Sequence, residues 1–395
     1  MFNFVFDRFI GGRPYPNLAP IQNVDNGYHG LGDSWPWITP LRLLYYAKDH
    51  NFPVRTIYIN EELPENSFYP VGLGWFDYSI DYFSMMSTQV LELLRTKQLK
   101  VLFYYHEGDS PYHEKRRLTE LTTQHNLPND CYCFISGNTS ADNIPGFIYF
   151  PDHELFYWRN GVVWNDQPQL GCDWHDFPRS RDFTILSRVH KWWRATVLAR
   201  LHQLELLKNS YWSYNNISIG DLYTNNPIEI DSFNELAAQV NQLVDGSPYA
   251  CDTQSEHEHN NHWNLIPEHF ENSYCNLVLE TLYDAEQSRG AFLTEKTFKP
   301  IRHAQPFIIF GCPNSLKTLR SLGYQTFDHA MDNSYDSEQN NTQRFIKTIE
   351  LVTRLANTDL KQWIKQCQDD CLHNQQLFVA SKFNRLNALY DKLLY

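Results

Sequence analysis

Residues 292–311, with the sequence FLTEKTFKPIRHAQPFIIFG, form the densest group of residues that could do chemistry. Thr294 is a suitable helix N-cap and Pro300 fits only if the helix begins near it, so Glu295 and Lys296 are expected at or just before a helix N-terminus. Such an end offers unpaired N–H groups and the positive end of a dipole. A phosphate or pyrophosphate is the natural partner of Lys296 there, and Glu295 could accept hydrogen bonds from sugar hydroxyls. A capped surface helix with a solvated Glu–Lys pair is the alternative.

This segment and the apolar run before it resemble the C-terminal signature of the fucosyltransferase-like glycosyltransferases, which have the GT-B fold. In that family a strand ending in Glu-Asn-Ser/Thr precedes a Y-x-T-E-K helix start, and a Pro-Val-like strand ending in Gly follows the helix. The matching pieces here are NLVLET (276–281), FLTEK (292–296) and QPFIIFG (305–311). Residues 314–327 are similar to a related group of phage and bacterial glycosyltransferase-like proteins, and the resemblance as a whole covers about residues 270–336.

The resemblance implies a nucleotide-sugar donor as co-substrate, with no other cofactor. Thr294 and Lys296 would belong to the donor site, Lys296 would stabilise the leaving diphosphate, and Glu295 and Glu280 would orient the donor's hydroxyls. The pair after Glu280 is Thr-Leu, where the family has Asn-Ser/Thr. The donor pocket is therefore expected to differ from that of a fucosyl donor, and fucose is not implied.

A second group of polar residues, SRVHKWWR, occupies residues 187–194. A helix is expected over residues 189–207, with His190 and Arg194 on its inward face. An inward arginine in the first turn of a helix needs an anionic partner, which could be a structural carboxylate. The resemblance implies instead that an early arginine contacts the donor pyrophosphate, with Arg194 the best match and Arg188 the second, and His190 is expected among the donor-binding residues with them. Arg194 and Lys296 would then place fixed positive charge where negative charge develops.

A third group, HEGDSP, follows an apolar run at residues 100–105 that reads as a buried strand. Ligands of open α/β sheets bind at the carboxyl ends of strands. The resembled family carries a catalytic glutamate in an E-S-P-like turn after such a strand, which implies that Glu107, or else Asp109, deprotonates the acceptor hydroxyl. A turn with solvated acids is the alternative.

The elements that must position these groups form two alternating series. Strands are expected at 55–59, 100–105 and 131–135, with helices at 38–47, 85–94 and 115–125. A second series has strands at 183–186, 276–279 and 306–310, with helices at 189–207, 296–304 and 314–322, and residues 342–395 read as helical throughout. This alternation predicts an α/β fold with two Rossmann-like domains facing a cleft, as in GT-B enzymes, and a helical C-terminal tail. The expected boundaries are 1–165 for acceptor binding, 166–340 for the nucleotide sugar, and 341–395 for helices across the junction.

Metal chemistry has one candidate, the loop EHEHNNH at residues 256–262. It matches no H-E-x-x-H helix, and the chain contains no D-x-D, so a solvated loop is favoured and no metal site is assigned. No G-x-x-x-x-G-K-[ST] occurs either, which excludes P-loop hydrolysis.

Composition sets the remaining limits. The chain has 395 residues, of which 42% are hydrophobic, and this predicts a folded protein. Its eight cysteines include no C-x-x-C pair, and neither a signal peptide nor a run of 18 apolar residues is found. A cytoplasmic protein with no transmembrane segment is therefore expected. The net charge of −13 opposes long-range attraction to nucleic acid.

We therefore expect a metal-independent glycosyltransferase that inverts the anomeric centre, with retention as the alternative. Its acceptor would be a glycan or a lipid-linked sugar. A phage-type DNA glycosyltransferase acting on a modified base is the sharper alternative, for which the cluster Arg179, Arg181, Arg188, Lys191, Arg194 and Arg200 leaves room. A non-catalytic nucleotide-sugar-binding protein on the same scaffold is the other.

Overall fold

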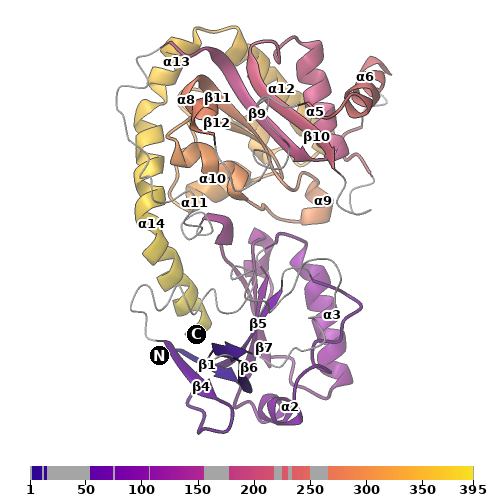
Figure 1. Cartoon of the computed structure of the whole chain (residues 1–395), viewed down its shortest axis with the longest axis vertical. Helices are drawn as coiled ribbons and strands as arrows, with labels where there is room; N and C mark the ends of the chain where they lie inside the picture. The colour runs from indigo at the N-terminus through magenta and orange to yellow at the C-terminus, as the bar shows by residue number, and fades with distance from the viewer. Residues whose placement is uncertain are drawn as a thin grey trace. The chain divides into compact units, whose positions relative to one another are not determined.

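The fold is described from a computed structural model of the chain (Figure 1). It describes residues 2–10, 13–15, 54–73, 76–105, 107–154, 178–217, 225–229, 234–249 and 266–394. Two compact units are present, the first comprising Met1–Asp152 with Phe383–Tyr395 and the second His153–Lys382. Each unit is built on a parallel sheet with helices, and the C-terminal part of the chain is helical, which confirms the predicted α/β class.

The first unit contains a six-stranded parallel sheet in the order β4-β1-β5-β6-β7-β8. Its strands are β1 (Phe2–Phe6), β4 (Val54–Tyr58), β5 (Ser67–Leu73), β6 (Lys100–Tyr105), β7 (Tyr132–Ser136) and β8 (Phe147–Tyr149). All of β5 is buried, and so is β6 apart from Lys100, as expected for strands covered on both faces. Helices α2 (Thr88–Arg95) and α3 (Pro111–Gln124), the 3₁₀ helix η2 (Thr139–Asn143) and a small antiparallel pair, β2 (Arg8–Ile10) and β3 (Arg13–Tyr15), complete the unit.

The second unit contains a four-stranded parallel sheet in the order β10-β9-β11-β12. Its strands are β9 (Arg181–Val189), β10 (Ser210–Ile217), β11 (Ser273–Leu279) and β12 (Phe307–Phe310). Helices α5 (Trp192–Gln203), α6 (Asn234–Asp245), α8 (Pro267–Glu271), α9 (Ala285–Ser288), α10 (Glu295–Arg302), α11 (Ser315–Ser321), the 3₁₀ helix η5 (Ser334–Ser337), α12 (Asn341–Ala356) and α13 (Leu360–Gln366) surround it. Figure 1 shows α5 and α12 beside this sheet, and α12 contacts both α5 and β12.

The last helix, α14 (Gln368–Leu394), contributes to both units. Its residues up to Lys382 belong to the second unit, and those from Phe383 belong to the first, where Lys392 Nζ lies 2.8 Å from Asp142 Oδ2.

Two local predictions are wrong. Strand β9 continues to Val189, because Ser187 and Val189 still pair with β10, so His190 precedes α5 instead of lying on that helix. Helix α10 begins at Glu295, which places Pro300 inside it. The amide missing at Pro300 would have bonded Lys296 near the start of a helix only eight residues long, so the loss is small.

Candidate functional site

The predicted start of α10 is confirmed at Thr294. Its backbone is extended, with φ −111° and ψ −177°, and its hydroxyl accepts a hydrogen bond from the Lys296 amide at 3.4 Å. Glu295 and Lys296 are the first two residues of the helix, so their side chains lie in its first turn. This turn lies next to the carboxyl end of β11, because the Thr294 amide donates a hydrogen bond to the carboxylate of Glu280, the residue that directly follows β11.

Glu280 connects the start of α10 to the loop after β11. It is completely buried, and its carboxylate accepts four hydrogen bonds, at 2.5–2.9 Å, from the amides of Thr281 and Thr294 and the hydroxyls of Thr294 and Thr297. A carboxylate has about four acceptor positions, and these donors occupy them. Glu280 therefore positions the helix start and the first residue of the loop after β11.

Two lysines converge on Thr281. Lys296 Nζ donates to the Thr281 hydroxyl at 3.2 Å and to Glu295 Oε1 at 2.6 Å. Lys191, the N-cap residue of α5, is only 3% exposed, and its Nζ donates to the Thr281 carbonyl at 2.5 Å. Lys191 was not among the predicted donor-binding residues. The expected helix began at residue 189 and placed Lys191 in its first turn, whereas the structure makes Lys191 the N-cap residue, with its side chain directed to Thr281.

Arg194 is buried, as its expected inward orientation requires, with 2% of its surface exposed. Its Nε and Nη2 donate to the Glu280 carbonyl at 3.2 and 2.5 Å, and its Nη1 donates to the Val189 carbonyl at 3.2 Å. These carbonyls lie at the ends of β9 and β11. The guanidinium therefore brings a positive charge to the carboxyl edge of the sheet.

Lys299 and Arg188 are two further cations near Lys296. Burial lowers the pKa of Lys299 to about 8, the Glu295 carboxylate opposes this change, and the charges of Lys296 and Arg188 lower the pKa further. Arg188 is exposed on β9, close to the carboxyl end of that strand. Lys299 was not among the predicted site residues, although its spacing from Glu295 already predicted that it lies one turn later on the same helix.

His190 lies in the same loop but is directed toward β10. Its Nδ1 is 2.5 Å from the Tyr214 hydroxyl, and its ring meets Trp192 edge-on at 4.8 Å. Burial lowers the pKa of His190, which favours the neutral imidazole.

A pocket of about 280 Å³ lies at the start of α5 and along the loop after β11. The wall is rigid where Trp193 stacks on Tyr283 at 4.9 Å and Arg344 lies over the Tyr283 ring at 4.5 Å. The pocket is lined by Lys191, Trp192, Trp193, Asn225, Pro227, Thr281, Leu282, Tyr283, Asp284 and Gln287. It thus combines an ammonium group, aromatic surface and the polar loop that both lysines contact.

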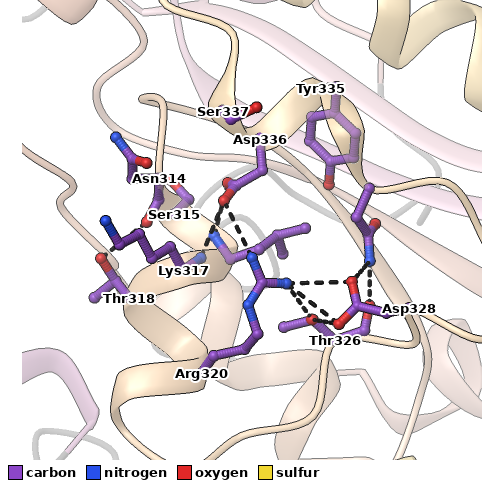
Figure 2. A network of polar contacts seen from close by, with 12 residues as sticks. Asn314, Ser315, Lys317, Thr318, Arg320, Thr326, Asp328, Tyr335, Asp336 and Ser337 are labelled. Atoms are coloured by element: carbon purple, nitrogen blue, oxygen red, sulfur yellow. Dashed lines mark hydrogen bonds and ion pairs between the residues drawn. The ribbon is translucent and has the colours of Figure 1, made fainter.

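A second hollow, of about 360 Å³, borders α11 and the loop that follows it, and several of the residues that line it form a polar network (Figure 2). Asp336 accepts from the amides of Leu316 and Lys317 at 2.8 and 3.0 Å. Arg320 lies 3.8 Å from Asp336 and donates to Asp328 at 3.2 Å. Asp336 thus ties the loop to the first turn of α11, and Arg320 ties it to the last turn, which accounts for these charges without a ligand.

In the first unit, the predicted acids Glu107 and Asp109 directly follow β6 and are half-buried. The Tyr105 hydroxyl donates to Asp109 Oδ2 at 2.5 Å. The loop backbone is held by the Gly137 amide, 3.1 Å from the Glu107 carbonyl, and by Asn138 Nδ2, 2.9 Å from the Gly108 carbonyl. Both acids therefore occupy a fixed turn at the carboxyl edge of the sheet.

A third acid, Glu114, was not predicted. It lies in the first turn of α3, is completely buried, and accepts a hydrogen bond from the Tyr78 hydroxyl at 2.9 Å. Burial raises its pKa to about 8, and the nearby Asp109 charge adds to the increase. The only sequence signal was its place four residues after a helix-starting Ser-Pro.

Within the residues that the structure describes, no three His, Cys, Asp or Glu side chains are grouped to hold a metal ion. The histidine-rich segment 256–262 lies outside those residues, as does the expected helix at 38–47. None of the described helices is long and apolar enough to cross a membrane.

Comparison with known proteins gives little. No family model and no curated protein matches the chain. Among solved structures, the crystal structure of α,α-trehalose 6-phosphate synthase from Burkholderia multivorans is similar at 10% identity and a TM-score of 0.30, over 89% of this chain and 69% of that chain. At that level the likeness carries no functional argument, and function has to be inferred from the geometry of the site.

Proposed function

We propose that this chain is a glycosyltransferase that uses a nucleotide-sugar donor, whose diphosphate binds where Lys191 and Lys296 meet at Thr281. The convergence of these lysines carries the proposal. An ammonium group as deeply buried as that of Lys191 is costly, and a bound anion would offset that cost. The start of α5, a 12-residue helix, faces the same pocket and adds the positive end of its dipole.

The chemistry follows from the position of the charges. As the bond from the anomeric carbon to the diphosphate breaks, negative charge grows on the diphosphate, and Arg194, Lys191 and Lys296 are already in place to stabilise it. Glu280 and Thr294 act as positioning residues, since they hold the start of α10 and the loop at Thr281. Glu295 would accept hydrogen bonds from the donor's sugar hydroxyls.

The nucleoside is proposed to occupy the adjacent pocket, where Trp192, Trp193 and Leu282 offer flat and apolar surface. The acceptor hydroxyl would be deprotonated by Glu107, with Asp109 as the second candidate. Direct displacement then inverts the anomeric centre without a bound metal.

A glycan or a lipid-linked sugar is the acceptor that the charge distribution favours. Three of the six residues in the cationic cluster considered for DNA binding are internal, since Arg179, Lys191 and Arg194 are 7%, 3% and 2% exposed. A DNA duplex needs a broad, exposed cationic surface, which these buried side chains do not provide, and the net charge of −13 opposes its approach.

A panel of UDP-, GDP-, dTDP- and ADP-sugars, screened by thermal shift, tests the proposal. A donor present at about 100 times its Kd stabilises the folded protein by about 2.7 kcal/mol. One nucleotide series is expected to stabilise the chain and to release its diphosphate when glycan acceptors are added. Stabilisation by none of them would refute the proposal. Binding without turnover on any acceptor would favour the non-catalytic alternative.

A further inference from the structure

Tyr78 is exposed and yet rigidly held. At 44% exposure it is the most exposed aromatic side chain in the described part of the chain. Its hydroxyl donates to Glu114 Oε1 at 2.9 Å, and its ring packs edge-on against Phe76 at a centroid distance of 5.0 Å. An exposed ring normally gains nothing from being fixed, so the fixed orientation points to a surface on which something stacks.

Burying Glu114, the group that holds the Tyr78 hydroxyl, costs folding free energy. Glu114 is completely buried, and its second oxygen, Oε2, is buried without a hydrogen-bond partner among the described residues. Unsatisfied polar atoms of this kind are uncommon in folded proteins and mark places where a partner is missing. Beside it, Asp109 is held by the Tyr105 hydroxyl and lies close enough for its charge to act on Tyr78.

The topology brings these groups to one edge. Tyr78 follows β5 and Asp109 follows β6, and these strands are parallel neighbours in register from Phe68–Lys100 to Leu73–Tyr105. Their carboxyl ends therefore meet at the edge of the sheet where open α/β folds bind ligands. The exposed ring and both carboxyl groups occupy that edge within a single unit.

We propose that Tyr78, Glu114 and Asp109 form a binding subsite for a neutral sugar ring. This proposal rests on the proposed function and specifies that the acceptor is a carbohydrate. A pyranose ring has an apolar C–H face that packs on an aromatic ring, while its hydroxyls lie around the rim and donate to carboxyl oxygens. The acids Glu107 and Asp109 would repel a phosphodiester, so this edge selects a neutral sugar over DNA.

Neutral methyl glycosides of glucose, galactose and N-acetylglucosamine are the probes, with binding followed by saturation-transfer NMR and calorimetry on the full chain. At least one should bind to the wild type, and Tyr78→Ala should weaken that binding at least tenfold. Tyr78→Leu keeps apolar bulk without the flat face and replaces the alanine variant if that variant does not fold. Glu120→Gln, on the exposed side of α3, is the matched control and should bind as the wild type does.

The proposal is overturned if no glycoside binds to the wild type, or if Tyr78→Ala and Tyr78→Leu bind it unchanged. Tyr78-dependent binding of tetramethylammonium or of duplex DNA, in place of the glycosides, would also overturn it. Binding of UDP and GDP is measured in parallel. If glycoside binding depends on Tyr78 but no nucleotide binds, the subsite stands and the proposed transferase function fails.

Discussion

Lys191 and Lys296 come from the starts of two different helices, yet both donate to Thr281, one to its carbonyl at 2.5 Å and the other to its hydroxyl at 3.2 Å. Two ammonium groups on one residue repel each other. The carboxylates of Glu295, 2.6 Å from Lys296, and of Glu280, 2.9 Å from the Thr281 amide, neutralise part of this charge, and Arg194 adds to the positive charge nearby. A bound diphosphate would relieve the remaining repulsion.

Replacing either lysine should therefore weaken the binding of nucleoside diphosphates. Lys191→Met and Lys296→Met each remove a charge-assisted contact worth about 1.5–3 kcal/mol, or about 10–150-fold in Kd for UDP or GDP by calorimetry. Lys208→Met removes an exposed lysine that pairs only at the surface with Glu205, and it is the control. Wild-type affinity in both test variants would exclude this site.

Glu280→Gln should reduce both stability and donor binding. The amide nitrogen of glutamine would face either the Thr281 or the Thr294 amide, so one buried N–H loses its acceptor, at a cost of about 1–3 kcal/mol. Urea unfolding measures this loss, with Glu286→Gln in α9 as an exposed control. An unchanged unfolding free energy would contradict the positioning role.

The sequence predicted the regular parts of this fold well. The strand expected at residues 100–105 is β6 as observed, and Thr294 is the N-cap it was expected to be. Both follow local rules, namely a continuous apolar run for a buried parallel strand and a short polar side chain before a helix.

Elements whose stability comes from neighbours could not be found in this way. Strand β5 contains Pro70 and Gly72, which are poor strand residues, but it pairs with both β1 and β6. Strand β10 is largely polar and is held as the neighbour of β9. Lys191 and Glu114 could not be predicted as site residues for the same reason. Their contacts are with Thr281 and Tyr78, which lie far away in the chain.

The raised pKa of Glu114 predicts a pH dependence of stability. Between its ordinary pKa of 4.5 and the folded value of about 8, the folded chain holds a proton that the unfolded chain has released. Stability should therefore fall as pH rises through this window, by up to about 1.4 kcal/mol per pH unit, and level off above it. Glu114→Gln lacks the titration, so its stability relative to the wild type should rise from pH 5 to 8 in urea unfolding. Parallel profiles for the two proteins would contradict the assignment, and Glu120→Gln serves as the control.

Chelation is expected to leave donor binding and turnover intact. The chain contains no D-x-D, and the cations at Thr281 supply the positive charge that a metal would otherwise provide. Activity after dialysis against EDTA, together with elemental analysis, checks this expectation. Stoichiometric zinc that is required for turnover would reverse it and would direct attention to His257, His259 and His262.

Glu107→Gln should abolish sugar transfer while leaving UDP or GDP affinity unchanged. Glutamine keeps the shape of the side chain but cannot accept the acceptor's proton, and general-base catalysis contributes about 10²–10⁴ in rate. Donor affinity should hold, because the proposed diphosphate site belongs to the second unit and Glu107 to the first. Asp109→Asn is the matched comparison, since Asp109 follows the same strand and already accepts a hydrogen bond from the Tyr105 hydroxyl. If Glu107→Gln keeps more than about a tenth of wild-type turnover while Asp109→Asn does not, then Asp109 is the base. If Glu107→Gln instead loses donor binding, the proposed division of roles between the two units is wrong.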